Sequence, residues 1–527
     1  MCVMERFFNI AGPCVRAKHY MLPATARLPE VEALIRREQY FVIHAPRQSG
    51  KTTALKQFVR DINGSGERVA MYCSLEALQN VTDVETAMHS VETLVAKAMK
   101  LSPPLAARAD ETLAYAKSPE VADDRASGLM SLLTKIAADC EKPLVVLFDE
   151  ADCLCYDPLI AFLRQLRNGY INREDAPFPA SLALVGLRNI KDYKMRVRPD
   201  GESVGQASPF NVITEVLPMR LFSFEEMCEL YAQHTDETGQ VFEEEALRLA
   251  YADSCGQPYL VNALARWCVE KIHHDDYSQP ITAADMAEAK EKIIREQGTH
   301  LDLLLEKLEE PRVRRVVEPV MLGGDVDRTH FADDVSYCLD LGLLVDERGS
   351  LKPANPIYAE TIGRFLTRGV QSEIHMKRPD NPWVRDGGLD MDGLLAAFQQ
   401  FWRENADANA VPHGYREAYP HLVLQAFLQR VINGGGQIVR EMALGSGRLD
   451  LGVHFRGAVY AVEVKTAANY AKSHEKAHRQ VLGYMDRLGR SEGWLVVADS
   501  DLTKPWDAKI SSETVQIDGR TIHVFCC

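Results

Sequence analysis

The stretch from Tyr40 to Leu55, YFVIHAPRQSGKTTAL, decides the fold of the first part of the chain. Its apolar beginning, Tyr40 to Ile43, predicts a buried parallel strand, and a helix-forming run starts at Lys51. Between them lies a turn with a proline and small residues. A strand, such a loop, Lys-Thr and a helix form the architecture in which backbone N–H groups and a helix N-terminus face a polyanion.

The loop follows the phosphate-binding pattern Gly, four residues, then Gly-Lys-[Ser/Thr], with one departure. Ala45 stands where the first glycine is expected, a change that adds only a methyl group. We expect Lys51 to reach the β and γ phosphates of a nucleotide, and the Thr52 hydroxyl to bind Mg²⁺. The expected nucleotide-binding residues are Ala45, Pro46, Arg47, Gln48, Ser49, Gly50, Lys51, Thr52 and Thr53.

A second motif, PLVVLFDEAD from Pro143 to Asp152, supplies acidic residues for such a site. Its apolar residues predict a central parallel strand that ends at Asp149 and Glu150. Asp149 would hold Mg²⁺ through water, and Glu150 would polarise the attacking water. Alone, the first motif also fits a surface loop, and the second fits a strand ending in a solvated acidic turn. Together they predict a site for ATP and Mg²⁺.

The composition is that of a globular protein without membrane segments. With 527 residues, 46% of them hydrophobic and 26% charged, the chain is expected to form roughly three or four domains. No apolar stretch approaches the roughly twenty residues of a membrane helix, and no signal peptide is recognised, so we expect a cytoplasmic protein. The 12 cysteines lack zinc-site spacing and are expected to be free thiols. The net charge of −15 argues against general polyanion coating but leaves room for a local basic groove.

The motif order resembles P-loop ATPases of the AAA+ type, and this resemblance implies roles for further residues. Arg188 or Asn189, directly after the apolar run Ser181 to Leu187, would contact the γ-phosphate as a sensor or simply solvate a loop. Arg164 and Arg167 are candidates for an arginine finger, a role that requires self-association with a neighbouring subunit.

The segments on either side of this core fit the same resemblance. His19 and Tyr20, before the first strand, would stack against adenine or pack inside the protein. A capping box at Ser223 opens a series of helices that resembles an AAA+ lid, and Pro258 stands in a Gly-x-Pro motif that couples nucleotide to domain position in related ATPases.

Residues 300–366 predict three short helices and a hairpin, which is a winged-helix pattern. We favour partner docking over DNA reading for this segment, because an acidic recognition helix fits DNA badly. The second helix is basic and the presumed recognition helix acidic, with Arg312, Arg314 and Arg315 in the former and Asp333, Asp334 and Asp340 in the latter.

A second chemical centre is predicted near the C-terminus, in a hairpin with Asp450 on one strand and Glu463 and Lys465 on the next. A period of two puts Glu463 and Lys465 on one face, opposite Asp450. Two facing carboxylates repel unless a divalent cation bridges them, and such a cation would also accept the carbonyl of Val464. Lys465 would orient or deprotonate its water. The alternative is an ordinary amphipathic hairpin.

The helix that follows from about Ser473 carries Gln480 and Tyr484 on one face. Together with Glu417 on an earlier helix, these residues and the hairpin resemble the PD-(D/E)XK nuclease superfamily, with Leu449 in place of the usual proline. The resemblance implies catalytic roles for Glu417, Gln480 and the hairpin residues. Basic residues nearby would contact phosphate, namely Lys472, Lys476, His478 and Arg479.

Over nearly its full length, the chain resembles a bacterial family of AAA-like ATPases with a C-terminal PD-(D/E)XK domain. The segments that carry this resemblance are HAPRQSGKTT, SPFNV, CGQPYLVNALA, THLDLLLEKL, ANPIY, LVLQAFLQRVINGGG and EVK. The implied α/β organisation is a P-loop parallel sheet (1–220), a helical lid (221–297), a winged-helix domain (298–368), a linker (369–390) and a restriction-endonuclease-like domain (391–527).

Three functions are compatible with this organisation. The leading hypothesis is a nucleotide-controlled, Mg²⁺-dependent DNA endonuclease, plausibly acting in defence against foreign DNA. The second is an ATP-dependent signalling switch whose nuclease-like domain only binds nucleic acid or a partner. The third is a DNA-translocating motor that works as a hexamer.

Overall fold

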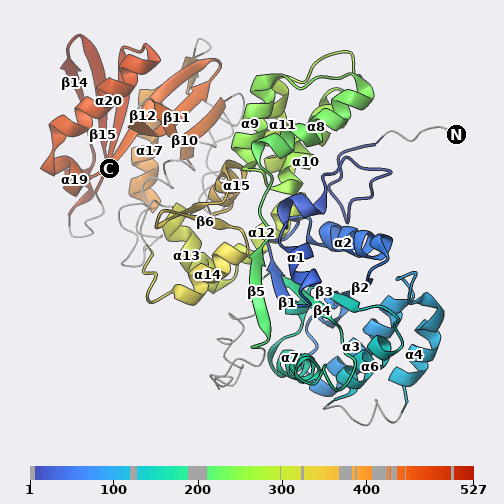
Figure 1. Cartoon of the computed structure of the whole chain (residues 1–527). Coiled ribbons are helices and arrows are strands. Elements are labelled where there is room, and N and C mark those ends of the chain that lie inside the picture. Colours follow the sequence, from blue (N-terminus) through green and yellow to red (C-terminus); the bar gives the residue numbers. More distant parts are fainter. Residues whose placement is uncertain are drawn as a thin grey trace. The chain divides into compact units, whose positions relative to one another are not determined.

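The computed structural model describes most of the chain (Figure 1). The described residues are 6–118, 127–187, 211–296, 298–321, 326–366, 383–385, 388–405, 424, 427–428, 436–444, 447–499 and 504–527. The chain divides into two compact units, of which the first comprises Met1–Val313 and Asp327–Tyr358 and the second comprises Arg314–Val326 and Ala359–Cys527. Helices α13 (Pro311–Met321) and α15 (Pro356–Leu366) therefore each pass from the first unit into the second.

The first unit is built on a parallel sheet, five-stranded within the described residues, in the order β2-β3-β4-β1-β5. Its strands are β1 (Tyr40–His44), β2 (Val69–Ser74), β3 (Leu144–Asp149), β4 (Ser181–Gly186) and β5 (Ile213–Pro218). The strand predicted from Tyr40 is thus interior, and β4 separates it from the acidic strand β3. Because parallel strands all end at one edge of the sheet, the loop after β1 and the end of β3 share that edge. The predicted α/β fold is confirmed for this unit.

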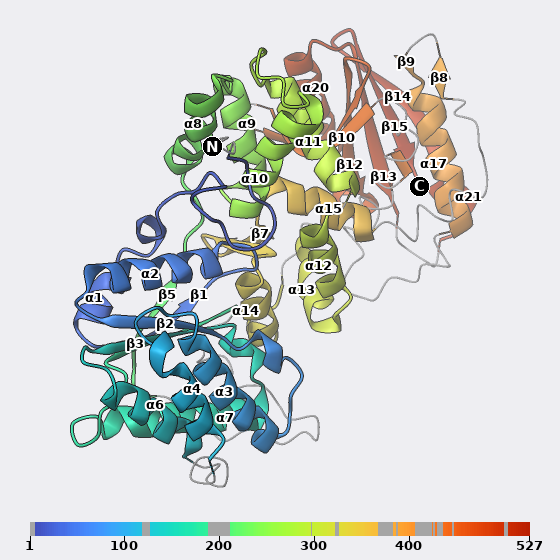
Figure 2. The same cartoon turned by 90° about the vertical axis from the view of Figure 1, so that its right-hand side faces the viewer.

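Different helices cover the two faces of this sheet (Figure 2). Successive residues of β1 divide between two apolar cores, with Tyr40 and Val42 in one and Phe41 and Ile43 in the other. The core of Phe41 is closed by α1 (Val31–Arg36) and α2 (Lys51–Ser65). The core of Tyr40 is closed by α3 (Val84–Met99), α4 (Ala109–Ala116), α6 (Gly128–Ala138) and α7 (Tyr156–Ile171).

A helical segment follows the sheet, as predicted. It consists of α8 (Phe224–Thr238), α9 (Glu244–Ser254), α10 (Pro258–Arg266), the π-helical turn Trp267–Ile272 and α11 (Ala283–Glu296). The capping box is present, because Ser223 Oγ accepts the backbone N–H of Glu226 while the Glu226 carboxylate accepts that of Ser223. Pro258 occupies the first turn of α10, where its missing N–H costs nothing.

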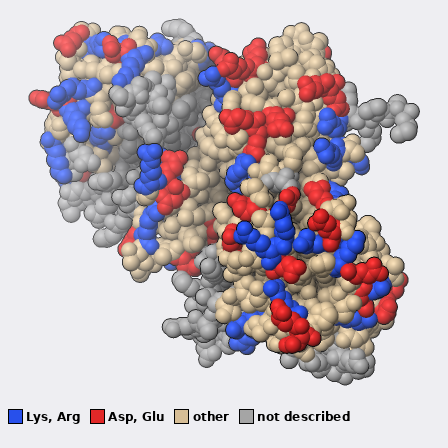
Figure 3. All heavy atoms as spheres, in the orientation of Figure 1, with Lys and Arg blue, Asp and Glu red and all other residues tan. Residues whose placement is uncertain are grey.

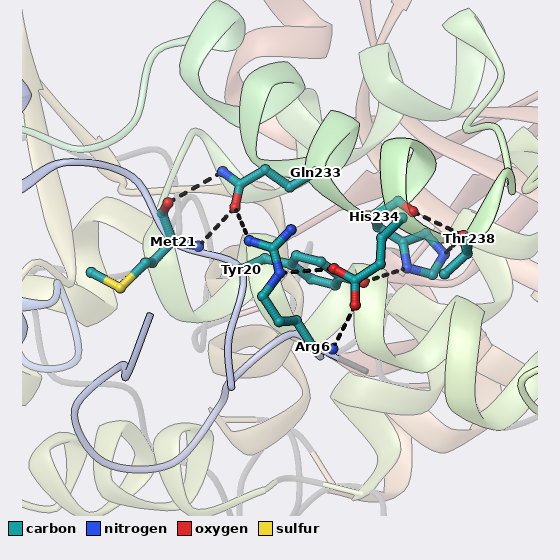
Figure 4. Close-up of polar contacts among 7 residues, drawn as sticks. Arg6, Tyr20, Met21, Gln233, His234 and Thr238 are labelled. Carbon is teal, nitrogen blue, oxygen red and sulfur yellow. Dashed lines mark hydrogen bonds and ion pairs between the residues drawn. The ribbon is translucent and has the colours of Figure 1, made fainter. Parts of the chain in front are cut away.

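Polar contacts tie the N-terminal segment to α8 (Figure 4). Arg6 Nε lies 2.8 Å from Glu237 Oε2, and Arg6 also donates to Gln233. The Tyr20 hydroxyl lies 3.3 Å from Nδ1 of the buried His234. Tyr20 itself is 1% exposed, so it packs inside the protein, which is the second of the two roles considered for it.

The three helices and hairpin predicted for residues 300–366 are present as α12 (Thr299–Leu308), α13, α14 (Ala332–Asp340) and the strands β6 (Leu344–Glu347) and β7 (Ser350–Pro353). Opposite charges on these helices neutralise each other. Arg312 Nη2 lies 3.0 Å from Asp333 Oδ2, and Arg312 Nε lies 3.3 Å from Asp334 Oδ1. The acidic start of α14 is thus a partner of α13 rather than an isolated acidic surface.

The second unit is built on a mixed sheet, six-stranded in the part of the chain that is described, in the order β10-β11-β12-β13-β15-β14. Its strands are β10 (Gly436–Leu444), β11 (Gly447–Phe455), β12 (Ala458–Thr466), β13 (Glu492–Ala498), β14 (Ser511–Ile517) and β15 (Arg520–Cys526). One face packs against α17 (Met391–Asn405), and the other against α19 (Ala467–Lys472) and α20 (His474–Leu488). Among the described helices of either unit, none has the length and apolar character needed to cross a membrane.

A pair of helical glycines tests the packing of the first unit. A Cβ at Gly169 of α7 would lie 2.2 Å from the ring of Phe178, whereas a Cβ at Gly64 of α2 would meet no atom within 4 Å. We expect Gly169→Ala to lower the free energy of unfolding by about 1–3 kcal/mol through overpacking. Gly64→Ala should raise it by up to about 1 kcal/mol, because alanine favours helix. Urea unfolding of both variants would measure the difference, and equal stabilities would contradict the packing described.

Candidate nucleotide site and C-terminal carboxylate centre

The loop between β1 and α2 has the backbone geometry of an anion-binding turn. Gly50, directly before α2, has a φ of +89°, which an L-residue adopts only with strain. Behind it lies the buried guanidinium of Arg27, whose Nη1 donates to the carbonyl of Ser49 at 2.7 Å. Burial lowers the pKa of Arg27 to about 10, so this group remains a cation at neutral pH. Arg27 was not predicted to belong to the site.

The backbone conformation of Ala45 shows why this position does not require the glycine of the phosphate-binding pattern. Among the described residues with positive φ, Ala45 is absent, so its backbone needs no glycine. It is buried at 2% exposure, and its N–H donates to the carbonyl of Gly186 at the end of β4. A methyl group at this position therefore packs into the sheet edge without strain.

The Lys51 side chain folds back onto the loop. Its Nζ donates to the carbonyls of Ala45 at 2.8 Å and Pro46 at 3.0 Å. Burial lowers the pKa of Lys51, and the opposing effect of nearby carboxylates, Glu150 foremost, raises it. The ammonium is thus held by neutral acceptors that an anion would outcompete, because charge-assisted hydrogen bonds are stronger than neutral ones.

The Asp149 carboxylate is fully buried and collects donors from several elements. Its Oδ2 accepts the Thr52 hydroxyl at 2.7 Å and the Tyr72 hydroxyl at 2.9 Å, and its Oδ1 accepts the N–H of Glu150 at 3.0 Å. Glu150 has a φ of +54°, a strained conformation of the kind found at functional sites. Burial raises the pKa of Glu150, and Lys51 counteracts that rise.

A cavity of about 860 Å³ opens at this edge of the sheet and brings most of the predicted residues together. From the predicted set, its wall includes Arg47, Gln48, Gly50, Lys51, Thr52, Thr53, Asp149, Glu150 and Pro258. Ala45, Pro46 and Ser49 lie behind that wall, where their backbone carbonyls hold the side chains of Lys51 and Arg27. This volume fits the range of pockets that hold small-molecule cofactors.

Residues that the sequence did not single out also line the cavity. The N-terminal segment, which was expected beside the adenine through His19 and Tyr20, contributes Asn9, Ile10, Gly12, Pro13 and Cys14 instead, and the Cys14 N–H donates to Thr53 Oγ1. Helices α12 and α14 contribute Lys307 and Tyr337. Just beyond α14, a Cβ at Gly342 would lie 2.6 Å from Pro46 Cγ, so this turn packs directly on the phosphate-binding loop.

Other predicted participants lie elsewhere. His19 and Tyr20 do not belong to the described wall of the cavity, and Arg188 and Asn189 lie outside the described residues. The finger candidates are both on α7, where Arg164 is exposed and Arg167 is half-buried. Neither arginine lines the cavity as far as the structure describes it.

The second predicted centre lies on β12. Glu463 is 1% exposed, and Lys465 Nζ lies 2.5 Å from Glu463 Oε1, so the two side chains share one face as the period of two predicts. The pairing of β11 with β12 ends at Leu451 with Val462, and Asp450 and Glu463 are the next residues of the two strands. The side chain of Asp450 is not described, and Glu417 lies outside the described residues.

The structure also shows where Val464, Gln480 and Tyr484, the other described members of the predicted centre, lie. Val464 is buried in the core on the α17 side of the sheet. Gln480 is half-buried on α20, and Tyr484, one turn further, packs against Ala461 of β12. Among the described side chains, no three His, Cys, Asp or Glu residues are grouped to hold a metal ion.

The basic character of α20 rests on fewer residues than predicted. Lys472 and Lys476 are exposed, but Arg479 lies 3.5 Å from Glu475. Burial lowers the pKa of His478, so it adds no charge at neutral pH. Figure 3 shows Lys and Arg side chains, with some acidic ones among them, over the part of the second unit that carries α20.

Comparisons with known proteins were made for the whole chain. No family model and no curated protein matches it. Among solved structures, the chain is similar to the Walker-type ATPase PABY2304 of Pyrococcus abyssi, with 13% identity, a TM-score of 0.46 and coverage of 67% of this chain and 99% of that one. It is also similar to the Aeropyrum pernix ORC1 protein in complex with DNA, with 13% identity, a TM-score of 0.36 and coverage of 67% of this chain and 95% of that one. A third similar structure is the Thermotoga maritima RuvB Holliday junction branch migration motor, with 14% identity, a TM-score of 0.35 and coverage of 64% of this chain and 92% of that one.

The positive φ of Gly50 gives a test of the loop. A Cβ there would lie 2.8 Å from Arg27 Nη2, in addition to the left-handed strain. We expect Gly50→Ala to weaken the binding of a fluorescent ATP analogue by about tenfold. Alanine must adopt the left-handed conformation when the nucleotide binds, and this costs roughly 1–2 kcal/mol. Ala45→Gly is the matched control and should bind as the wild type does. Wild-type affinity in Gly50→Ala would contradict this account of the loop.

Proposed function

We propose that the first unit binds and hydrolyses Mg²⁺·ATP and that the second unit cleaves DNA with Mg²⁺ under control of that nucleotide. The observation that carries the proposal is the hydrogen bond between Thr52 and the buried Asp149, in one cavity with Lys51 and Glu150. A cation, a hydroxyl and two carboxylates converge there at the N-terminus of a helix. This set of groups is what phosphoryl transfer to water requires.

The donor chemistry of the site fits Mg²⁺. Thr52 and Asp149 offer a hydroxyl and a carboxylate, the oxygen donors that Mg²⁺ prefers, and Glu150 and Asp152 add negative charge to the cavity wall. The cation, when bound, would neutralise charge on the β and γ phosphates. Lys51 would exchange its loop carbonyls for phosphate oxygens. Glu150, as the carboxylate beyond Asp149, would orient the attacking water.

The proposal for the second unit rests on Glu463 and Lys465. A buried carboxylate is costly unless it is paired, so the 2.5 Å contact to Lys465 supports an ion pair held ready on the sheet. Asp450 follows the last paired residues of β11 and β12 on the same side as Glu463 along the strands, which supports a second carboxylate near that point. Such a set would take Mg²⁺ and activate water for phosphodiester hydrolysis. Lys472 and Lys476 on and beside α20 would contact the DNA backbone.

Glu150 gives the test of the ATPase. We expect Glu150→Gln to bind the fluorescent ATP analogue within about twofold of wild type and to release phosphate about 10²- to 10⁴-fold more slowly, because the amide cannot take a proton from water. Glu76→Gln is the matched control, since Glu76 also lines the cavity but lies at an exposed position. Phosphate release at the wild-type rate from Glu150→Gln would exclude this role.

Cleavage of DNA tests the second unit. We expect linear and plasmid DNA to be cut by the full chain with Mg²⁺, at a rate that differs with and without ATP. The double variant Glu463→Gln, Lys465→Met should be at least about 10²-fold slower, because both the metal ligand and the water-orienting cation are lost.

The control is the double variant Asp486→Ala, Arg520→Ala, which removes another ion pair of the same unit, 2.7 Å long. It should cut as the wild type does. If the wild type and the Glu463/Lys465 variant behave alike on all substrates, the nuclease proposal fails. DNA binding without cleavage would then favour the signalling switch, with ATP hydrolysis intact.

A further inference from the structure

The Asp149 carboxylate has one donor that the proposed hydrolysis does not use, the hydroxyl of Tyr72. Its oxygen lies 2.9 Å from Asp149 Oδ2. Tyr72 pairs with Leu147 on β3 and lies two residues before Ser74, which pairs with Asp149, so Tyr72 and Asp149 share one face of the sheet. Its side chain lines the same cavity and packs on the α2 side of the sheet, with Lys56 Nζ 5.3 Å from the ring centre.

The Tyr72 hydroxyl occupies one of the few hydrogen-bond acceptor positions of the Asp149 carboxylate. An ionised carboxylate offers about four lone-pair positions, two on each oxygen. On Oδ2, the Thr52 and Tyr72 hydroxyls fill both. On Oδ1, the N–H of Glu150 fills one. Counting the donors in the described part of the chain, a single acceptor position therefore remains on Asp149, and it lies on Oδ1.

We propose that Tyr72 is a positioning residue for the metal–nucleotide site. Its hydroxyl holds the Asp149 carboxylate in one orientation and leaves only Oδ1 to accept a hydrogen bond from water bound to Mg²⁺. Tyr72 acts through Asp149 and is not assigned a contact with the nucleotide. This inference rests on the proposed Mg²⁺·ATP site and adds to it the residue that fixes where the hydrated cation sits.

The chain provides a matched comparison for the loss of such a hydroxyl. Tyr40 lies on β1 of the same sheet, is fully buried and donates its hydroxyl to the carbonyl of Pro179 at 2.8 Å. Tyr40 does not line the described part of the cavity. Tyr40→Phe and Tyr72→Phe thus each remove an internally hydrogen-bonded hydroxyl and keep the ring, but only the second removes a donor to Asp149.

The experiment titrates Mg²⁺ against the full chain with a fluorescent ATP analogue, for wild type, Tyr72→Phe and Tyr40→Phe, and repeats the binding in EDTA. We expect Tyr72→Phe to need about three- to tenfold more Mg²⁺ for half of the Mg²⁺-dependent gain in affinity, the size of one net hydrogen bond. Its affinity in EDTA should stay within about twofold of wild type, because Tyr72 acts only through the metal-facing carboxylate. Tyr40→Phe should match the wild-type Mg²⁺ titration.

Each other outcome has a defined meaning. An unchanged Mg²⁺ requirement in Tyr72→Phe overturns the inference, and so does an equal change in Tyr40→Phe. A loss of affinity in EDTA as large as that in Mg²⁺, or a thermal midpoint far below that of Tyr40→Phe, would mark Tyr72 as structural only. If the wild type binds no nucleotide in either condition, the proposed ATP site itself fails, so the two failures are distinguishable.

Discussion

The first unit depends on satisfying one buried charge, the carboxylate of Asp149 at the end of β3. A carboxylate without water must find hydrogen-bond donors, and an unmet one would cost several kcal/mol, roughly a third or more of a domain's stability. Thr52 at the start of α2 and Tyr72 on β2 supply them. The two hydrogen bonds connect β2, β3 and α2 at the sheet edge, so folding of the unit also assembles the cavity.

The same edge carries an electrostatic arrangement suited to a polyanion with a divalent cation. Asp149, Glu150 and Asp152 place negative charge on the cavity wall. Lys51 is close enough to feel these carboxylates, but its Nζ donates hydrogen bonds to loop carbonyls, and Arg27 is buried behind the loop. A ligand that brings both phosphate and Mg²⁺ would bind the cation and the carboxylates together.

Features formed by residues that are adjacent in the sequence could be predicted from it. Features that depend on how separate strands and segments pack together could not. The P-loop, the acidic strand and the capping box are continuous motifs, and they were located correctly. Strand β5 was missed because only one of its six residues, Leu217, is buried, so it has no apolar run. Arg27 and Tyr72 enter the site only through the packing of separate segments, and no spacing rule reports that. The register of β2 on β3 would have been the one signal for Tyr72.

The chain passes between the two units more than once. The segment Asp327–Tyr358 belongs to the first unit, yet the chain on both sides of it, Arg314–Val326 and Ala359 onward, belongs to the second. Within that segment, Tyr337 lines the cavity and Gly342 packs on Pro46 of the loop. At its C-terminal end this segment continues directly into the second unit, because α15 begins at Pro356 in the first unit and ends at Leu366 in the second. A displacement of this segment would therefore reach the second unit through a helix, which resists bending more than a loop does.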